Sequence, residues 1–165
     1  MLVIFLTDGN VFALDVSPLL IKGHPQTPSS SVDFLFMQYR TLLREHPNSQ
    51  YRDDAIFANG EYYYLSSTYD EAQKFFQQYL SEGKDLKRKL FAQGYLLRIA
   101  QMQNNVELIQ KLAKEIRTYK QHIFIFSHSK EYFLNSPLKR RHSVIYSINQ
   151  IEFYVGQDLL AKVSF

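Results

Sequence analysis

The fold depends on how residues 148–165, INQIEFYVGQDLLAKVSF, are interpreted. Ile151, Phe153 and Val155 alternate with more polar neighbours, and β-branched or aromatic residues at every second position are typical of a strand. Ile148, Ile151 and Val155 also recur at intervals of three and four residues, which would put them on one face of a helix ending at the next glycine. The stretch therefore allows a β-hairpin or a helical hairpin.

The composition is that of one folded domain. A chain of 165 residues can bury a core without disulfides or a metal. Hydrophobic residues at 45% and charged residues at 21% give an ordinary globular balance. A net charge of +3 falls short of the concentrated basic surface of a nucleic-acid binder. With no cysteine, disulfide frameworks, thiol nucleophiles and a lipidated cysteine are excluded for this chain.

Residues 1–30 differ in character from the remainder. The start, MLVIFLTDGNVFALDVSP, places small residues after an apolar run and resembles the back half of a signal peptide. The same residues also permit a short strand that turns at Asp8-Gly9-Asn10. A Gly/Pro/Ser-rich linker, KGHPQTPSSS, follows over residues 22–31. We therefore expect a signal-like or extended segment over 1–30 and a helical domain over 31–165.

Helical signals are dense from residue 32 to residue 119. Apolar residues follow helical spacing, with possible N-caps at Ser30, Ser49 and Thr68 and a helix end at Gly83. Five helices are predicted, over about residues 32–43, 51–65, 68–80, 85–103 and 106–119. Short connections between short helices are typical of antiparallel helical hairpins.

One set of spacings suggests a repeat. Gly60 is followed by Tyr63, Ala72 and Phe76 at three, twelve and sixteen residues, and Gly94 lies 34 residues after Gly60. Small residues leave room where two helices cross closely, and aromatic residues fill the gaps between neighbouring hairpins. This pattern resembles the tetratricopeptide repeat (TPR), whose period is about 34 residues.

The resemblance extends to the closing stretch. Ala161 and Phe165 reproduce the spacing of Ala72 and Phe76, and Pro137 after a serine would begin a helix. We therefore predict an all-α, TPR-like stack of about three antiparallel helical hairpins, the last one either complete or truncated. The alternative is an α+β fold with a C-terminal β-hairpin. The region of residues 120–135 would hold an inserted helix, a prolongation of the fifth helix, or a strand.

The segment HPNSQYRDDAIFANGEYYYL is similar to bacterial cell-envelope TPR proteins, of the TolA-binding division-coordinator type and the outer-membrane assembly lipoprotein type. The resemblance implies a non-catalytic scaffold that binds a protein or peptide partner, in the periplasm or otherwise exported. The alternatives are a cytoplasmic TPR adaptor and a basic nucleic-acid-binding helical domain. An uncapped last repeat would also favour self-association.

The resemblance also implies a partner-binding groove along the first helix of each hairpin. Tyr and Phe bury a large area at low rotamer cost, and Arg adds a directional donor for a carboxylate. The alternative is that the same aromatic residues form the core between helices. The predicted groove residues are Phe57, Glu61, Tyr64, Phe91, Tyr95, Arg98, Tyr146, Gln150 and Phe153.

Two basic runs, residues 87–89 and 139–142, are interpreted as solvated faces, or alternatively as a patch for nucleic acid or anionic lipid. The five histidines show no metal-ligand spacing, and no nucleophile elbow, Walker loop or dinucleotide loop is present. We therefore expect no enzyme activity, no cofactor and no metal.

Overall fold

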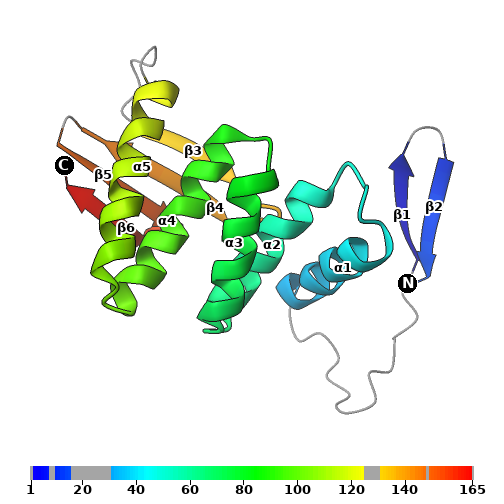
Figure 1. Ribbon diagram of the computed structural model, residues 1–165. Helices are drawn as coiled ribbons and strands as arrows, with labels where there is room; N and C mark the ends of the chain where they lie inside the picture. Colours follow the sequence, from blue (N-terminus) through cyan, green and yellow to red (C-terminus); the bar gives the residue numbers. More distant parts are fainter. Residues whose placement is uncertain (1, 8–9, 16–30, 125–130, 148, 165) are drawn as a thin grey trace.

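The protein has an α+β architecture in a computed structural model (Figure 1), which describes residues 2–7, 10–15, 31–124, 131–147 and 149–164. Side chains are described for residues 31–118, 134–147 and 149–164. The helices are α1 (Ser31–Glu45), α2 (Arg52–Leu65), α3 (Tyr69–Glu82), α4 (Leu86–Met102) and α5 (Val106–Phe124). The strands are β1 (Leu2–Thr7), β2 (Asn10–Asp15), β3 (Glu131–Asn135), β4 (Arg141–Tyr146), β5 (Gln150–Val155) and β6 (Asp158–Ser164).

The prediction of five helices is confirmed. Each helix packs against the next one in the chain, and together they form a row with α1 at one end and α5 at the other (Figure 1). Gly83 ends α3, and the carboxylate of Asp85 accepts hydrogen bonds from two backbone N–H groups at the start of α4. The fifth helix continues to Phe124, beyond its predicted end.

The closing stretch forms two strands, so the predicted third helical hairpin is wrong. β5 and β6 pair antiparallel, and Gly156 in the turn between them has a φ of +64°. Ile151, Phe153 and Val155 are buried while their neighbours are more exposed, which is the two-residue period of a strand. The uncapped helical repeat that would have favoured self-association is therefore not formed by these residues.

Four strands make one antiparallel sheet in the order β3-β4-β5-β6. The predicted helix start at Pro137 is also wrong, because this proline lies in the turn between β3 and β4. In that turn the N–H of Ser136 donates to the carbonyl of Arg140 at 2.8 Å, and the hydroxyl of Ser136 accepts from the N–H of Arg140 at 3.1 Å. The serine thus closes a β-turn instead of capping a helix.

The N-terminal residues form a separate two-stranded hairpin, with Leu2 opposite Asp15 and Thr7 opposite Asn10. The alternative of a strand turning near Asp8-Gly9-Asn10 agrees with this pairing, although residues 8 and 9 lie outside the described part. The predicted linker over 22–31 lies outside it too, apart from Ser31, the first residue of α1.

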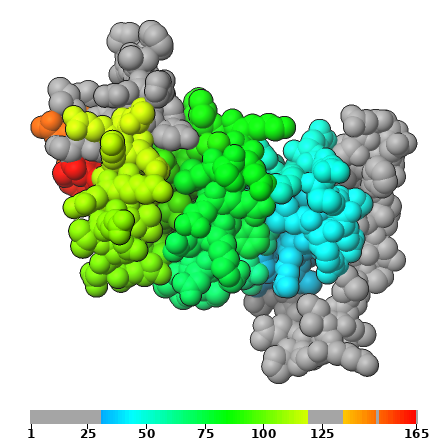
Figure 2. All heavy atoms as spheres, in the orientation of Figure 1, coloured from blue at the N-terminus to red at the C-terminus, as the bar shows by residue number. Residues whose placement is uncertain are grey.

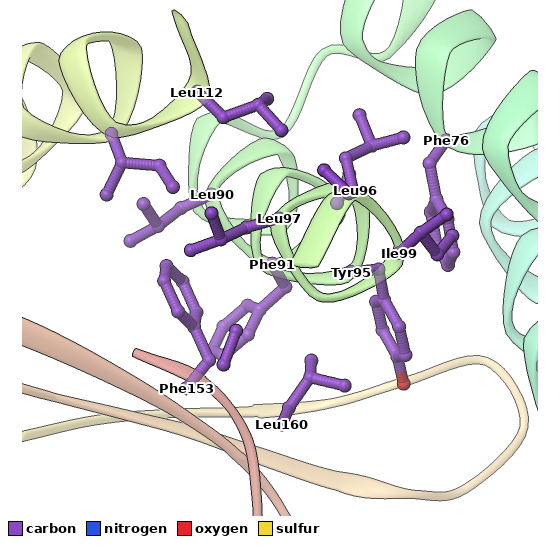
Figure 3. Packing of buried hydrophobic residues seen from close by; sticks show 14 of the residues in the cluster. Phe76, Leu90, Phe91, Tyr95, Leu96, Leu97, Ile99, Leu112, Phe153 and Leu160 are labelled. Atoms are coloured by element: carbon purple, nitrogen blue, oxygen red, sulfur yellow. The ribbon is translucent and has the colours of Figure 1, made fainter. Parts of the chain in front are cut away.

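The core lies between the helices and the four-stranded sheet. Phe153 and Leu160 point from the sheet toward Phe91 and Tyr95 of α4 (Figure 3). In the orientation of Figure 1, the helices form a continuous surface and little of the sheet is visible (Figure 2). The sheet therefore covers one face of the helical row, mainly at α4, which β6 also contacts.

Candidate functional site

The predicted groove is buried beneath the sheet. Phe57, Glu61 and Phe91 have no exposed surface, and Tyr95 is 1% exposed. The ring of His142 in β4 lies 6.1 Å from that of Phe57, between centroids, and 5.4 Å from that of Phe91. The aromatic residues in this conformation form core, as the alternative interpretation proposed, and a partner cannot reach them.

The remaining predicted groove residues do not form one surface on helices. Tyr64 is half-buried and Arg98 is exposed. Tyr146 and Gln150 are partly buried and Phe153 is fully buried, but all three lie on β4 and β5. Their assignment to the first helix of a third hairpin is therefore wrong.

The contacts between α2 and α4 retain the 34-residue period. Three side-chain pairs relate residues one period apart: an ion pair, a hydrogen bond of 3.2 Å and an electrostatic interaction between a phenol and a guanidinium. They are Asp54–Arg88, Glu61–Tyr95 and Tyr64–Arg98. A Cβ atom on Gly60 would come within 2.9 Å of Phe76, which confirms the predicted close crossing in the first hairpin. Gly94, one period later, packs instead against Phe153 of the sheet.

A buried polar cluster joins the helices to the sheet. The Tyr95 hydroxyl lies 2.8 Å from Nε2 of His142 and 3.2 Å from Oε1 of Glu61. Nε2 of His142 also lies 3.2 Å from the same carboxylate oxygen, and its Nδ1 lies 3.2 Å from the carbonyl oxygen of Arg140. Glu61 and His142 are completely buried.

Two donors of this cluster can be assigned. The Arg140 carbonyl only accepts, so Nδ1 of His142 is the donor in that contact. Burial, followed by the charge of Glu61, raises the pKa of Tyr95 well above its ordinary value, so its hydroxyl stays protonated. The Tyr95 hydroxyl can therefore donate to Oε1 of Glu61 or to Nε2 of His142.

This cluster has the residue types of a catalytic site but no path for a substrate, because all three side chains are enclosed. Its hydrogen bonds connect α2, α4 and β4 instead. We therefore interpret it as the polar contact that orients the sheet on the helices.

An open cleft of about 470 Å³ lies where the helical row meets the turn between β3 and β4. This volume is in the range of small-molecule and peptide side-chain sites. Its lining comes from α1, α2, α4, the end of β3 and the turn that follows, and consists of Tyr39, Asp54, Arg88, Asn135, Ser136, Pro137 and Lys139.

Arg88 is the most enclosed charge in the cleft, with 16% of its side chain exposed. Its guanidinium donates to the carboxylate of Asp54 and lies 5.8 Å from the ring centroid of Phe57. Burial is the largest effect on Arg88 and lowers its pKa, but the charge and hydrogen bond of Asp54, together with Tyr79 and Asp85, outweigh it, and the pKa is raised overall. Burial also raises the pKa of Tyr39, with a further contribution from Asp54. The arginine is thus a fixed cation beside a neutral phenol.

Lys139 lines the cleft, and its backbone adopts a conformation that is rare for lysine. Its φ is 63°, in the left-handed region where glycine and asparagine are favoured. Its N–H donates to the carbonyl of Ser136 at 2.9 Å, and the neighbouring Leu138 is only 2% exposed. The turn is therefore anchored by hydrogen bonds and by a buried side chain.

Comparison with known proteins gives no match to a family model, a curated protein or a solved structure. Among the described residues, no three metal-ligating side chains come together. None of the helices in the described part is long and apolar enough to cross a membrane.

Sequence reasoning missed the cleft. The sequence pattern puts Asp54 in the first turn of the second predicted helix, where a carboxylate suits the helix dipole, and it puts Arg88 and Lys139 in the two basic runs interpreted as solvated faces. The pair Asp54–Arg88 carried a usable signal, because opposite charges one repeat period apart can meet on adjacent helices. The turn that supplies Lys139 carried no such signal, because it can be located only once β3 and β4 are known to be strands.

Proposed function

We propose that the protein is a non-catalytic scaffold that binds a protein or peptide partner, and that it does so through the cleft rather than the predicted groove. One observation carries the proposal: the Asp54–Arg88 ion pair, whose two residues lie one repeat period apart, lines an open polar cleft. Helical repeat arrays use the surfaces of successive hairpins to bind partners. Here the sheet occupies the inner face, and the cleft at its border stays accessible.

We also propose that α2–α3 and α4–α5 are two TPR-like hairpins, with the sheet in the place of a third. The 34-residue side-chain pairs and the Gly60–Phe76 contact support this view. The proposal of two hairpins rests on the spacing of these residues along the chain and on the packing of the helices. A bacterial cell-envelope location, with a cytoplasmic adaptor as the alternative, completes the proposal and rests on the N-terminal pattern and the resemblance.

Site-specific photo-crosslinking tests partner binding. A benzophenone amino acid placed at Tyr39 would report contacts in the cleft, in cells that express the chain. The same group at Met37, exposed on the same helix, is the matched control. We expect a protein adduct from position 39 that is absent from position 37 and is lost when Arg88→Gln is added. Equal adducts from both positions, or none from 39, would contradict the proposal.

Cell fractionation with mass spectrometry of the N-terminus tests the location. A periplasmic chain that lacks its first residues would support export. An intact N-terminus in the cytoplasmic fraction would favour the adaptor alternative. A crosslinked adduct sensitive to nuclease would instead favour a nucleic-acid partner.

A further inference from the structure

The charges of the cleft favour one kind of ligand. Arg88 and Lys139 are cations and Asp54 is an anion, while Tyr39, Asn135 and Ser136 are polar and uncharged. The lining therefore carries one net positive charge, which a single monoanion would balance. A phosphate dianion would leave an excess negative charge beside Asp54.

Arg88 is positioned before any ligand arrives. Asp54 binds its Nη1 atom, and the ring of Phe57 lies against the guanidinium. A guanidinium has five N–H donors in a planar fork whose geometry matches a carboxylate. Because it is already oriented and partly desolvated, it loses little side-chain freedom when a carboxylate binds.

Lys139 supplies the second charge at a conformational cost. Glycine would fit a φ of 63° without strain, yet lysine occupies the position. Strained backbone of this kind concentrates at binding and catalytic sites, where the surrounding structure holds it in place. The hydrogen bonds around Ser136 hold the turn, so the lysine leaves a fixed backbone close to the polar groups of Asn135 and Ser136.

We propose that the cleft binds a carboxylate group of a peptide, with Arg88 as the first cationic donor and Lys139 as the second cation. Tyr39, Asn135 and Ser136 offer hydrogen bonds to the adjoining amide groups. The inference rests on the proposed function and specifies the chemistry of the partner that the cleft recognises.

Nuclear magnetic resonance titration of the full chain tests the inference with defined probes. N-acetyl-trialanine carries only a terminal carboxylate, and its C-terminal amide carries none. Acetyl-Ala-Glu-Ala-amide carries only a side-chain carboxylate, and inorganic phosphate is the competing anion. We expect saturable shifts of the Ser136, Lys139 and Arg88 signals with one or both carboxylate peptides and none with the amide. The stronger of the two carboxylate peptides identifies the source.

Three variants make the test specific. Lys139→Gly should weaken carboxylate binding about tenfold, corresponding to the loss of one charge-assisted contact. Arg88→Gln should weaken it at least as much, and Lys84→Gln, which removes the same charge outside the cleft lining, should leave it unchanged. Because Arg88→Gln also disturbs a partly buried ion pair, Lys139→Gly is the decisive variant: its unfolding midpoint should rise while binding falls.

Binding of phosphate but not of either carboxylate would overturn the inference, as would equal binding of the amide peptide. Binding that survives Lys139→Gly would also overturn it. If no probe binds while position 39 still forms a specific protein adduct, the carboxylate chemistry is wrong and the proposed function stands. If both experiments are negative, both fail.

Discussion

Gly94 of α4 lies against the ring of Phe153 in β5, so closely that a Cβ atom on the glycine would be 2.7 Å from Cδ1 of the phenylalanine. In the preceding hairpin the equivalent Gly60 receives the ring of Phe76, from the next helix. A glycine–phenylalanine contact thus joins α2 to α3, and the same kind of contact 34 residues further along the chain joins α4 to the sheet.

Gly94→Ala should lower the free energy of unfolding by about 1–3 kcal/mol, because Phe153 is fully buried and the added methyl group overpacks the core. Denaturant unfolding followed by circular dichroism measures the change. Phe153→Leu should relieve part of the Gly94→Ala loss but none of the loss from Gly60→Ala. If Gly94→Ala stabilised the protein by about 1 kcal/mol, as helix propensity alone predicts, the close contact would be refuted.

Tyr95→Phe should cost about 1–3 kcal/mol of unfolding free energy, because it leaves buried polar atoms of His142 and Glu61 without a hydroxyl partner. Tyr64→Phe is the matched control, since that hydroxyl belongs to a half-buried ring and interacts electrostatically with the exposed Arg98. We expect less than half the loss there. Equal losses in chemical denaturation would show that the buried cluster does not orient the sheet.

Lys139→Gly should stabilise the protein by about 1 kcal/mol, because glycine adopts a positive φ without the clash that a Cβ atom causes. Gly156→Ala offers the opposite change in the turn between β5 and β6, where φ is +64°. We expect it to destabilise by about the same amount, although nothing lies within 4 Å of the added carbon. Two changes of the same sign in thermal unfolding would contradict the assigned turn conformations.

Stability should fall at alkaline pH. Burial raises the pKa of Tyr79 to about 12, against an ordinary value of 10.0. Between these values the unfolded chain loses the Tyr79 proton while the folded chain keeps it, so the stabilisation present below pH 10 is lost as pH rises toward 12. The loss from this residue is on the order of 1–2 kcal/mol.

Unfolding of the Tyr79→Phe variant over pH 9–12 isolates this contribution. The variant should show a shallower decline than the parent chain, since phenylalanine has no proton to lose. The slope that remains should come from the other tyrosines whose pKa burial raises, such as Tyr39, Tyr64 and Tyr95. Identical slopes for the two proteins would refute the prediction.

The helices could be predicted from sequence because residues 32–119 combine helical spacing with breakers at their ends. The C-terminal sheet could not be decided, because over so short a stretch Ile151 and Val155 satisfy both the strand and the helix period. Packing resolved the ambiguity: Phe153 and Ile151 are buried when they alternate on a sheet that faces α4. The repeat resemblance outweighed strand propensity in the prediction, and this was the error.

The candidate site was only partly predictable. Glu61 and Tyr95, like Tyr64 and Arg98, lie one repeat period apart, but the period alone could not show that the sheet would cover Phe57 and Phe91. Contacts with His142 depend on the position of a strand 47 residues beyond Tyr95, which local pattern does not encode.

The docking of the sheet also has a consequence for the order of folding. Contacts within the helical row join helices that follow one another in the chain. The hydrogen bond between Tyr95 and His142 joins residues that are 47 positions apart. Local contacts form faster than distant ones because they close smaller loops. We therefore expect the helices to assemble first and to leave the aromatic face of Phe57, Phe91 and Tyr95 exposed until the strands pack against it. During that interval the nascent chain would be most prone to aggregate or to engage a chaperone.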